Sequence, residues 1–451
     1  MHNTSAVRRF TSLFNRRLPR RKLHVLHRRH CRRRRPPRVS FADFLRALVY
    51  HAVMGTGRLE THLFEQTAEL LSAPAISRRR QRLPWQLFRD LLAQCLRPQA
   101  DRRRHPEAFY HGYRLVGLDG TCFGVHNVPR LVCALGKAST RRFKAAFALV
   151  RTVVLVELGL HNPIAAAIGR HGESELELAW GLIAQLPQRS LLLADRLYGL
   201  PLFVGTLLAR CLEVQGQFLV RIRRRLKTRL IEVLPDGSAL VELRVPCDDG
   251  EPCVFLVREI RGRVSGRGST VTSLRLWTSL LDHAAHPAAE LLVLYAQRWE
   301  VELTIKELKV ELRGSDRLAS YTIDTAAQEI AALLLAQAVL VEARVLRSRQ
   351  AQVAVLRISF RDVLHQVRFL WSLLALGEGG YRQRTYRAVL RGLIGELRCD
   401  VNPPRRARSC PRAVRQPVTG WPRLLRRHET QGEFCYEVVK HPASKRQPHC
   451  P

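Results

Sequence analysis

Residues 295–309, YAQRWEVELTIKELK, carry a Tyr, an Arg, a Glu and a Lys separated by three, four and seven positions. On an α-helix these intervals place Tyr295, Arg298, Glu302 and Lys309 on one face. No Pro or Gly interrupts the stretch, so the sequence predicts a helix. Helices rich in Glu, Lys and Arg are usually solvated surfaces with weak ion pairs. A functional role for this face therefore requires residues elsewhere that need the Glu302 carboxylate.

The surroundings of this stretch fit the same prediction. Pro287 stands where the helix can be entered, and Gly314 stands where it can end. An apolar flank is expected to seat the helix on a core, while the polar face looks into a site or into solvent. The residues of this flank are Trp299, Leu303, Ile305 and Leu308.

The composition of the chain indicates a polyanionic partner. The 451 residues are 46% hydrophobic, which is ample for a globular protein with sizeable cores. Lys and Arg number 75 against 38 Asp and Glu, which gives a formal net charge of +37, and the arginines occur in runs. Nucleic acid is the expected partner of such a chain.

Cysteine spacing and hydropathy exclude several classes of protein. The eleven cysteines include no C-x-x-C pair, and the closest two are Cys247 and Cys253. We therefore predict free thiols in a reducing compartment, with neither a disulfide framework nor a zinc site. The start, MHNTSAVRRF, has no apolar signal core, and no uncharged run is long enough to span a membrane. These features predict a cytoplasmic protein with no membrane partner.

The first hundred residues are basic and then helical. Residues 1–39 form an arginine-rich arm, which either orders on phosphate backbones or adds non-specific attraction. Residues 40–100 have helical periodicity in FADFLRALVYHAVM, LETHLFEQTAELL and LPWQLFRDLLAQCL, with a predicted basic turn at 77–80. Helices separated by basic turns suit DNA binding. No helix-turn-helix follows from this periodicity, so an ordinary helical bundle remains equally compatible.

The next region changes to strands, and two of them are followed by an aspartate. Residues 113–118 predict a strand that ends in a tight Asp-Gly turn at Asp119, and 191–194 predict a buried strand that ends at Asp195. Each aspartate alone is an ordinary turn former. In a mixed sheet, however, carboxylates at strand ends collect at one edge. The elements predicted between them are strands at 146–158 and 164–168 and a helix at 173–186.

Asp119, Asp195 and Glu302 together would form a three-carboxylate cluster. Hard oxygen ligands suit Mg²⁺ or Mn²⁺, and such a cluster can hold two ions. Two ions about 4 Å apart can activate a water or a 3′-hydroxyl and stabilise the leaving oxygen of an in-line phosphoryl transfer. The Arg and Lys of the same helix face would then bring positive charge to the scissile strand, and the Tyr would contact a phosphate or a sugar.

Three motifs resemble those of DDE transposases of bacterial insertion sequences, specifically the insertion sequence 4 family. They are LDGT at 118–121, LADR at 193–196 and the spacing Tyr-x2-Arg-x3-Glu-x6-Lys, which is matched at all four positions. The resemblance also covers SAPAISRRRQRLPWQLFRDLL, the Ile-Ser-Phe at 358–360 and NPPRRARSCPRAV. Family members usually have Gly soon after the arginine of the second motif. Leu197 stands there in this chain, which could alter the turn but not the ligand.

The resemblance implies an α/β fold with an RNase H-like catalytic domain, in which Asp119, Asp195 and Glu302 bind two Mg²⁺ or Mn²⁺ ions. It also implies contacts to transposon-end DNA. The residues assigned to these contacts are Tyr295, Arg298 and Lys309, together with Arg196 of the second motif.

Residues 216–290 resemble the β-rich insertion of the same family. Asp-Gly pairs at 236 and 249 predict hairpin turns. The basic segment RIRRRLKTR, at 221–229, either follows a DNA backbone or protects a strand edge. Some relatives stack a flipped base on a tryptophan upstream of the glutamate, but Trp277 lies in a strand pattern that favours a core role. The predicted strands are 217–222, 230–234, 239–245, 254–259 and 270–278.

The C-terminal part is predicted to be helical and then flexible. Helices are expected at 325–347 and 360–376, and the sequence from 402 is basic and Pro-rich. Family members pair two subunits on two DNA ends, which implies a homodimer there, although the sequence has no heptads. The predicted order is a basic arm (1–39), a helical DNA-binding domain (40–100), the catalytic domain (107–215 and 291–318), the β-rich insertion (216–290), C-terminal helices (319–400) and a basic flexible tail (401–451).

The sequence thus predicts a DNA transposase acting in the bacterial cytoplasm on nucleoid DNA. It would cleave the inverted terminal repeats of its insertion sequence and join the 3′-hydroxyl to target DNA by two-metal-ion phosphoryl transfer. Two alternatives remain open. A metal-dependent nuclease or resolvase on the same fold would only hydrolyse DNA. A non-catalytic DNA-binding descendant would have lost a catalytic carboxylate, and none is missing.

Overall fold

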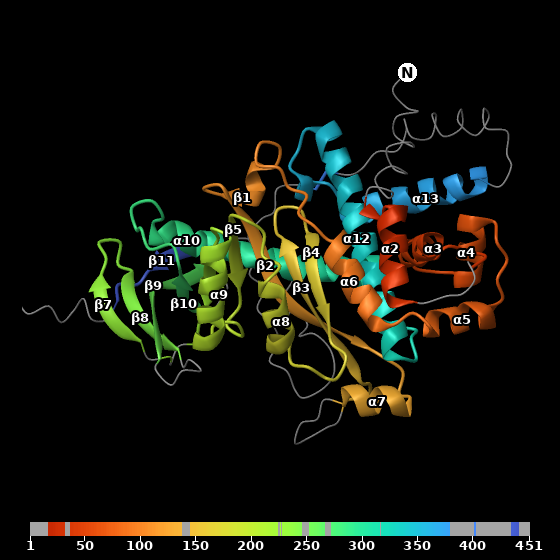
Figure 1. Cartoon of the computed structure of the whole chain (residues 1–451). Helices are drawn as coiled ribbons and strands as arrows, with labels where there is room; N and C mark the ends of the chain where they lie inside the picture. The colour runs from red at the N-terminus through yellow and green to blue at the C-terminus, as the bar shows by residue number, and fades with distance from the viewer. Residues whose placement is uncertain are drawn as a thin grey trace, which may run out of the picture. The chain divides into compact units, whose positions relative to one another are not determined.

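The computed structural model describes residues 17–31, 37–137, 145–223, 226, 228–245, 252–266, 272–315, 317–378, 401–402 and 434–441. The chain divides into two compact units, which Figure 1 shows with their helices and strands. Unit 1 comprises Met1–Phe109, Leu118–Gln185 and Glu300–Val401, and unit 2 comprises Tyr110–Gly117, Leu186–Trp299 and Asn402–Pro451.

Helix α12 (Ile323–Ala351) is the central element of unit 1. Every residue from 330 to 341 is buried, which is three turns covered on all faces. The helices α3 (Phe41–Met54) and α6 (Trp85–Cys95) pack against it, as Figure 1 shows. It also contacts α13 (Phe360–Glu378) and the sheet. The predicted helices at 325–347 and 360–376 are therefore confirmed, and the first of them is the core of unit 1.

Helix α5 (Ala73–Gln81) occupies the segment that the sequence predicted as a basic turn, so that prediction was wrong. Pro74 lies in its first turn, where proline is tolerated, and arginine is itself a good helix former. Helix α2 (Arg20–His30) lies within the predicted basic arm and buries Leu23 and Leu26. The remaining helices among the described residues of unit 1, outside the Glu302 region, are α4 (Leu59–Thr67), η1 (Pro106–Ala108), α7 (Pro129–Leu135), α8 (Glu175–Ile183) and η4 (Val355–Arg357).

The sheet confirms the predicted α/β class and the RNase H-like order of strands. The order is β4-β3-β2-β5-β6. β2, which comes first in the chain among these five strands, therefore lies between β3 and β5. β3 and β4 pair antiparallel, whereas β5 and β6 pair parallel. Helix α8 connects β4 to β5, and α9 (Pro201–Glu213) connects β5 to β6. The strands are β2 (Tyr113–Gly124), β3 (Leu149–Glu157), β4 (Asn162–Ile168), β5 (Ser190–Ala194) and β6 (Gln217–Arg221), with the short β1 (Phe109–Tyr110) beside β2.

Antiparallel strands extend the sheet in unit 2. Their order is β6-β10-β9-β8-β7, and the predicted hairpin turn at Gly237 joins β7 to β8 with a positive φ of 83°. The predicted turn at 249 lies outside the described residues. The strands are β7 (Arg229–Val233), β8 (Ala239–Val245), β9 (Cys253–Gly266) and β10 (Thr272–Thr278).

Three findings in unit 2 bear on the sequence predictions. Trp277 is fully buried and its Nε1 donates to Glu259 Oε2 at 3.1 Å, as expected of a core residue. Cys253 is disulfide-bonded, so the prediction of free thiols was wrong at this position. Part of the C-terminal tail is also ordered by pairing, because β11 (Phe434–Val438) runs antiparallel to β9.

The turn between β3 and β4 offers a test of this packing. An added Cβ at Gly159 would lie 2.5 Å from Ala108 Cβ and 2.6 Å from its Cα, so the backbone would have to move. We predict that Gly159→Ala lowers the free energy of unfolding by about 1–3 kcal/mol. Urea denaturation measures this. The matched control is Gly181→Ala in α8, where no atom lies within 4 Å of the added Cβ. That change should be neutral or stabilise by about 0.5–1 kcal/mol, and equal effects of the two substitutions would contradict the packing described.

Candidate active site

Asp119 lies inside strand β2, five residues before its end, and is half-buried. The sequence predicted a turn at Asp119-Gly120, and that prediction was wrong. A Cβ at Gly120 would lie 2.2 Å from the carboxyl carbon of Glu175, the flexible end of that side chain, so the glycine leaves room for this carboxyl group. Successive residues of a strand point to opposite faces. The side chains at positions 119 and 120 therefore point to opposite faces of β2.

The segment that carries Glu302 is helical throughout, but it is not one regular α-helix. Pro287 caps its start and Gly314 its end, with a positive φ of 71°, as predicted. Between them, a 3₁₀ turn and a π-helical stretch change the angular spacing of side chains, so the expectation of a single face at α-helical spacing was wrong. The segments are α10 (Ala288–Tyr295), η2 (Ala296–Arg298), α11 (Trp299–Lys306) and η3 (Glu307–Arg313).

The predicted apolar flank of this segment is only partly buried. Leu308 is 1% exposed, but Trp299 is 50% exposed. Leu303 and Ile305 are half-buried, and Val301 is fully buried. The buried residues of α11 are Val301 and Thr304, so the buried face of this helix differs from the predicted flank.

Tyr295 links the helical segment to the second aspartate motif within unit 2. Its hydroxyl donates to the carbonyl of Ala194 at 3.2 Å, and Ala194 is the last residue of β5, immediately before Asp195. Burial raises the pKa of Tyr295, nearby Arg298 lowers it and Asp195 raises it. Tyr295 is therefore a neutral hydrogen-bond donor. Asp195 is half-buried directly after the strand, as predicted, and Arg196 is exposed.

Lys309 links the helical segment to the first aspartate motif within unit 1. Its Nζ donates to the carbonyl of Cys122 at 3.0 Å and lies 5.6 Å from the ring centroid of Phe123. Cys122 lies three residues after Asp119 on β2. The ammonium group thus sits beside the strand that carries the first carboxylate. In unit 2, the guanidinium of Arg298 lies 5.5 Å from the ring centroid of Trp299.

A buried histidine that sequence reasoning missed contacts a glutamate on each side of Glu302. His161 is fully buried in the turn between β3 and β4, with a positive φ of 57°. Its Nε2 lies 2.7 Å from Glu300 Oε2, and its Nδ1 lies 2.8 Å from Glu307 Oε2. Burial opposes the charged imidazole, but the charge and hydrogen bonds of Glu307 and Glu300 outweigh it, so the pKa of His161 is raised. The pair of carboxylates brackets Glu302, which fixes how this helix faces the sheet.

Arg344 of α12 completes this network. Its Nη1 lies 3.2 Å from Glu307 Oε1, and its Nε donates to the carbonyl of Ile358 at 2.8 Å. The carboxylates of Glu300 and Glu307 thus face two cationic side chains, those of His161 and Arg344. This pairing avoids the free-energy cost of an unpaired carboxylate away from water. The spacing of Glu300 and Glu307, which are seven positions apart, is a weak sequence signal, and nothing in the sequence singles out His161.

The structure distributes the predicted site residues over the two units. Unit 1 holds Asp119, Glu302 and Lys309, and unit 2 holds Asp195 and the residues around Tyr295. Across the described parts of the chain, no three His, Cys, Asp or Glu side chains are gathered as a metal site. The three-carboxylate site therefore stays a prediction. Among the same residues, no helix combines the length and apolar character needed to cross a membrane.

The chain is similar to known transposases in sequence. Residues 110–338, which include all three predicted carboxylates, match the model of the family described as Transposase DDE domain. The chain is 28% identical over 264 residues to "Transposase InsG for insertion sequence element IS4" of Escherichia coli (strain K12), which is 58% of this chain and 59% of the relative. It is 29% identical over 135 residues to "Putative transposase InsZ" of the same organism, which is 30% of this chain and 45% of that relative. The chain thus spans less than two thirds of the length of either relative.

A solved structure is also similar. It is described as the cryo-EM structure of the piggyBac transposase synaptic complex with hairpin DNA. The similarity covers 84% of this chain and 84% of that chain, with a TM-score of 0.45 and 10% sequence identity.

The histidine network predicts a pH dependence of stability. The pKa of folded His161 is raised, so its contribution is complete below the ordinary histidine pKa of about 6.5 and is lost as the pH rises through the raised value. We predict that His161→Gln lowers the free energy of unfolding by about 3 kcal/mol at low pH and flattens its decline at higher pH. Urea denaturation across this pH range measures both effects. His24→Gln, at an exposed position on α2, is the control. Parallel pH profiles for wild type and His161→Gln would show that the network is not charged.

Proposed function

The chain belongs to the family of DDE transposases, and from this premise we propose that it is a DNA transposase in which Asp119, Asp195 and Glu302 are the catalytic carboxylates. The proposed reaction cuts one strand at each end of an insertion sequence and leaves a 3′-hydroxyl. That hydroxyl then attacks a phosphodiester of target DNA. Each step forms one P–O bond and breaks another, so the reaction needs no external energy source.

One observation within each unit carries this proposal. The signature residues of the helical segment contact the two strands that precede or bear the aspartates. Tyr295 contacts the carbonyl of Ala194, next to Asp195, and Lys309 contacts the carbonyl of Cys122, three residues after Asp119. In a solvated surface helix, these two side chains would point to solvent or to neighbouring charges. Here they contact the strands of both aspartate motifs. The contacts thus favour the functional role of the helix over the solvated one.

The donor atoms suit divalent cations of the hard type. Asp119, Asp195 and Glu302 are half-buried, so their carboxylates are accessible and yet partly shielded from water. All three offer only oxygen ligands, which Mg²⁺ and Mn²⁺ prefer over nitrogen and sulfur. When bound, two such ions supply Lewis-acid stabilisation of the attacking and leaving oxygens. The family implies dependence on divalent metal, and we propose these three residues as ligands of two Mg²⁺ or Mn²⁺ ions.

The remaining residues of the signature have roles in holding DNA. Arg298 and Lys309 would neutralise phosphates near the scissile bond, and Arg196 is exposed directly after Asp195. Tyr295 remains a neutral donor because its pKa is raised by burial. We place its primary role in fixing the strand end beside Asp195. The proposed partners are the terminal repeats and target DNA of a bacterial cytoplasm, and a homodimer would bring two ends together.

The carboxylates are tested by cleavage of a labelled duplex that carries the terminal repeat flanking the gene, with Mg²⁺ or with EDTA. We predict that Asp119→Asn, Asp195→Asn and Glu302→Gln each abolish metal-dependent cutting at the repeat boundary while DNA affinity stays within about twofold, because affinity comes from cations. The control is Glu311→Gln in η3, whose carboxylate pairs with Arg361 at the surface. Normal cutting by one of the three variants would remove that residue from the site.

The same assay separates the rival functions. Products in which the cut end is joined to a second duplex favour a transposase. Cutting without joining favours a nuclease or resolvase that performs only hydrolysis. Tight binding without cutting by the wild type would favour a non-catalytic descendant and would overturn the proposal.

The cations of the helix are tested by the salt dependence of DNA binding. We predict that Arg298→Ala and Lys309→Ala each reduce the salt slope of end binding by about one ion. Lys306→Ala is the matched control, since Lys306 is exposed on α11 only three positions from Lys309. If all three variants keep the wild-type slope, Arg298 and Lys309 belong to a solvated helix surface.

A further inference from the structure

Helix α5 presents a polar and basic face to solvent in unit 1. Ser77, Arg78, Gln81 and Arg82 are all exposed, and their spacing places them on one side of the helix and its C-cap. The opposite side is buried and includes Ile76. The sequence APAISRRRQ thus forms an amphipathic helix whose outer face has no apolar side chain larger than proline and alanine.

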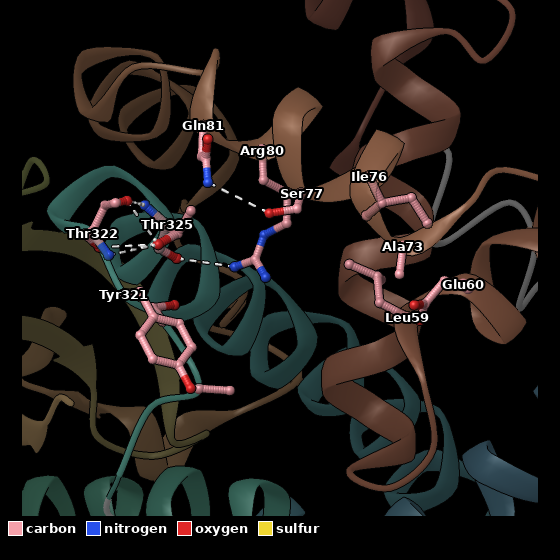
Figure 2. A pocket seen from close by; sticks show the side chains of 12 residues that line it. Leu59, Glu60, Ala73, Ile76, Ser77, Arg80, Gln81, Tyr321, Thr322 and Thr325 are labelled. Carbon is pink, nitrogen blue, oxygen red and sulfur yellow. Dashed lines mark hydrogen bonds between the residues drawn. The ribbon is translucent and has the colours of Figure 1, made fainter. Parts of the chain in front are cut away.

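Two hollows flank this helix, so that it stands between them as a ridge. The first, of about 210 Å³, lies between α5 and the start of α12, and Figure 2 shows Ser77, Arg80 and Gln81 on one side of it and Tyr321 and Thr322 on the other. The second hollow, of about 360 Å³, lies on the other flank of α5. It is lined by Pro37, Arg38, Val39, Leu71, Ala75, Arg78, Arg79 and Arg82.

The second hollow has a strongly positive lining. Four of its eight residues are arginines and none is a carboxylate. Arg38 pairs with Glu69. For Arg78 and Arg82, no ion pair is found among the described residues. Two exposed guanidinium groups thus remain available beside a hollow, which is the arrangement that binds phosphate groups.

The ridge is held rigidly by its inner arginines. Arg79 is buried and donates to the carbonyl of Val39 at 2.8 Å. Arg80 donates from Nη2 to the carbonyl of Thr325 at 3.2 Å and from Nε to Gln328 Oε1 at 3.2 Å. The three arginines therefore differ in role. Arg79 holds α5 to the start of α3, and Arg80 holds it to α12, whereas Arg78 is exposed. A surface that is fixed in this way loses little conformational entropy on binding.

We propose that α5 enters the major groove of duplex DNA, with the second hollow receiving one sugar-phosphate wall of that groove. An α-helix with its side chains is about 10–12 Å wide, and the major groove of B-DNA is about 12 Å wide. Arg78 and Arg82 contact phosphates from the second hollow. Ser77 and Gln81 face base edges, since Gln reads adenine and Ser donates to or accepts from several bases. This inference rests on the proposed function, because it assigns to the transposase the helix that reads its DNA.

The test measures affinity and sequence preference separately. The full chain is mixed with a library of random-sequence duplexes without divalent metal, and the bound fraction is sequenced. The double variant Arg78→Ala/Arg82→Ala should bind all duplexes roughly tenfold more weakly and lower the salt slope by about two ions. Gln81→Ala and Ser77→Ala should keep most of the affinity but lose about tenfold in preference at one or two base positions. The control is Arg102→Ala/Arg103→Ala, an equal charge change at two exposed positions of unit 1.

The outcomes distinguish this inference from the proposed function. If the wild type selects a motif and the α5 variants select the same motif with the same salt slope, the role of α5 is overturned while the transposase proposal stands. Equal losses in the α5 and control double variants would mean a general charge effect and would also overturn the role of α5. A wild type that binds no duplex would overturn the proposed function and this inference with it.

Discussion

The buried pairing of His161 with Glu300 and Glu307 is the interaction on which the helical segment of the predicted site depends. A buried carboxylate without a partner costs several kcal/mol, so these two glutamates fix the helix to the one place where a cation meets both. Glu302 lies between them in the sequence and has no freedom to turn away. The orientation of a predicted catalytic carboxylate is thus set by two neighbouring carboxylates that perform no chemistry, and by a histidine from a distant turn of the sheet.

The segment that carries these glutamates is not a regular helix. Its 3₁₀ turn and π-helical stretch have poorer hydrogen-bond geometry than an α-helix, and such stretches are often found at functional sites. Glu307, the first residue of the π-helical stretch, contacts His161, and Lys309 within this stretch donates to the carbonyl of Cys122. A regular helix has one angular spacing between successive side chains. In this stretch, the contacts of Glu307 and Lys309 occur together with the burial of Leu308. The irregular stretch thus carries contacts to β2 and to the turn between β3 and β4.

The strands and most helices could be predicted from the sequence because their apolar periodicity is local. The α/β class with an RNase H-like domain also followed, through resemblance. The position of Asp119 could not, since Asp-Gly is a turn signal, whereas β2 continues through this pair to Gly124. His161 was equally hidden, because its two partners lie more than a hundred residues away. Long-range polar contacts produce no periodic pattern in the sequence. Sequence reasoning therefore predicts the strands and helices of the site better than the polar contacts that hold them in place.

The net charge of +37 overstates the charge available to DNA. Some arginines are structural. Arg258 is fully buried and donates to the carbonyl of His286 at 2.7 Å. Arg344 is also buried and donates to the carbonyl of Ile358 at 2.8 Å. The N–H groups of such an arginine donate to backbone carbonyls, and its charge is buried away from solvent. Attraction to phosphates falls to the exposed arginines, whose position matters as well as their number. Within one run, Arg79 belongs to the first class and Arg78 to the second, so charge counting by sequence runs cannot locate a DNA-binding surface.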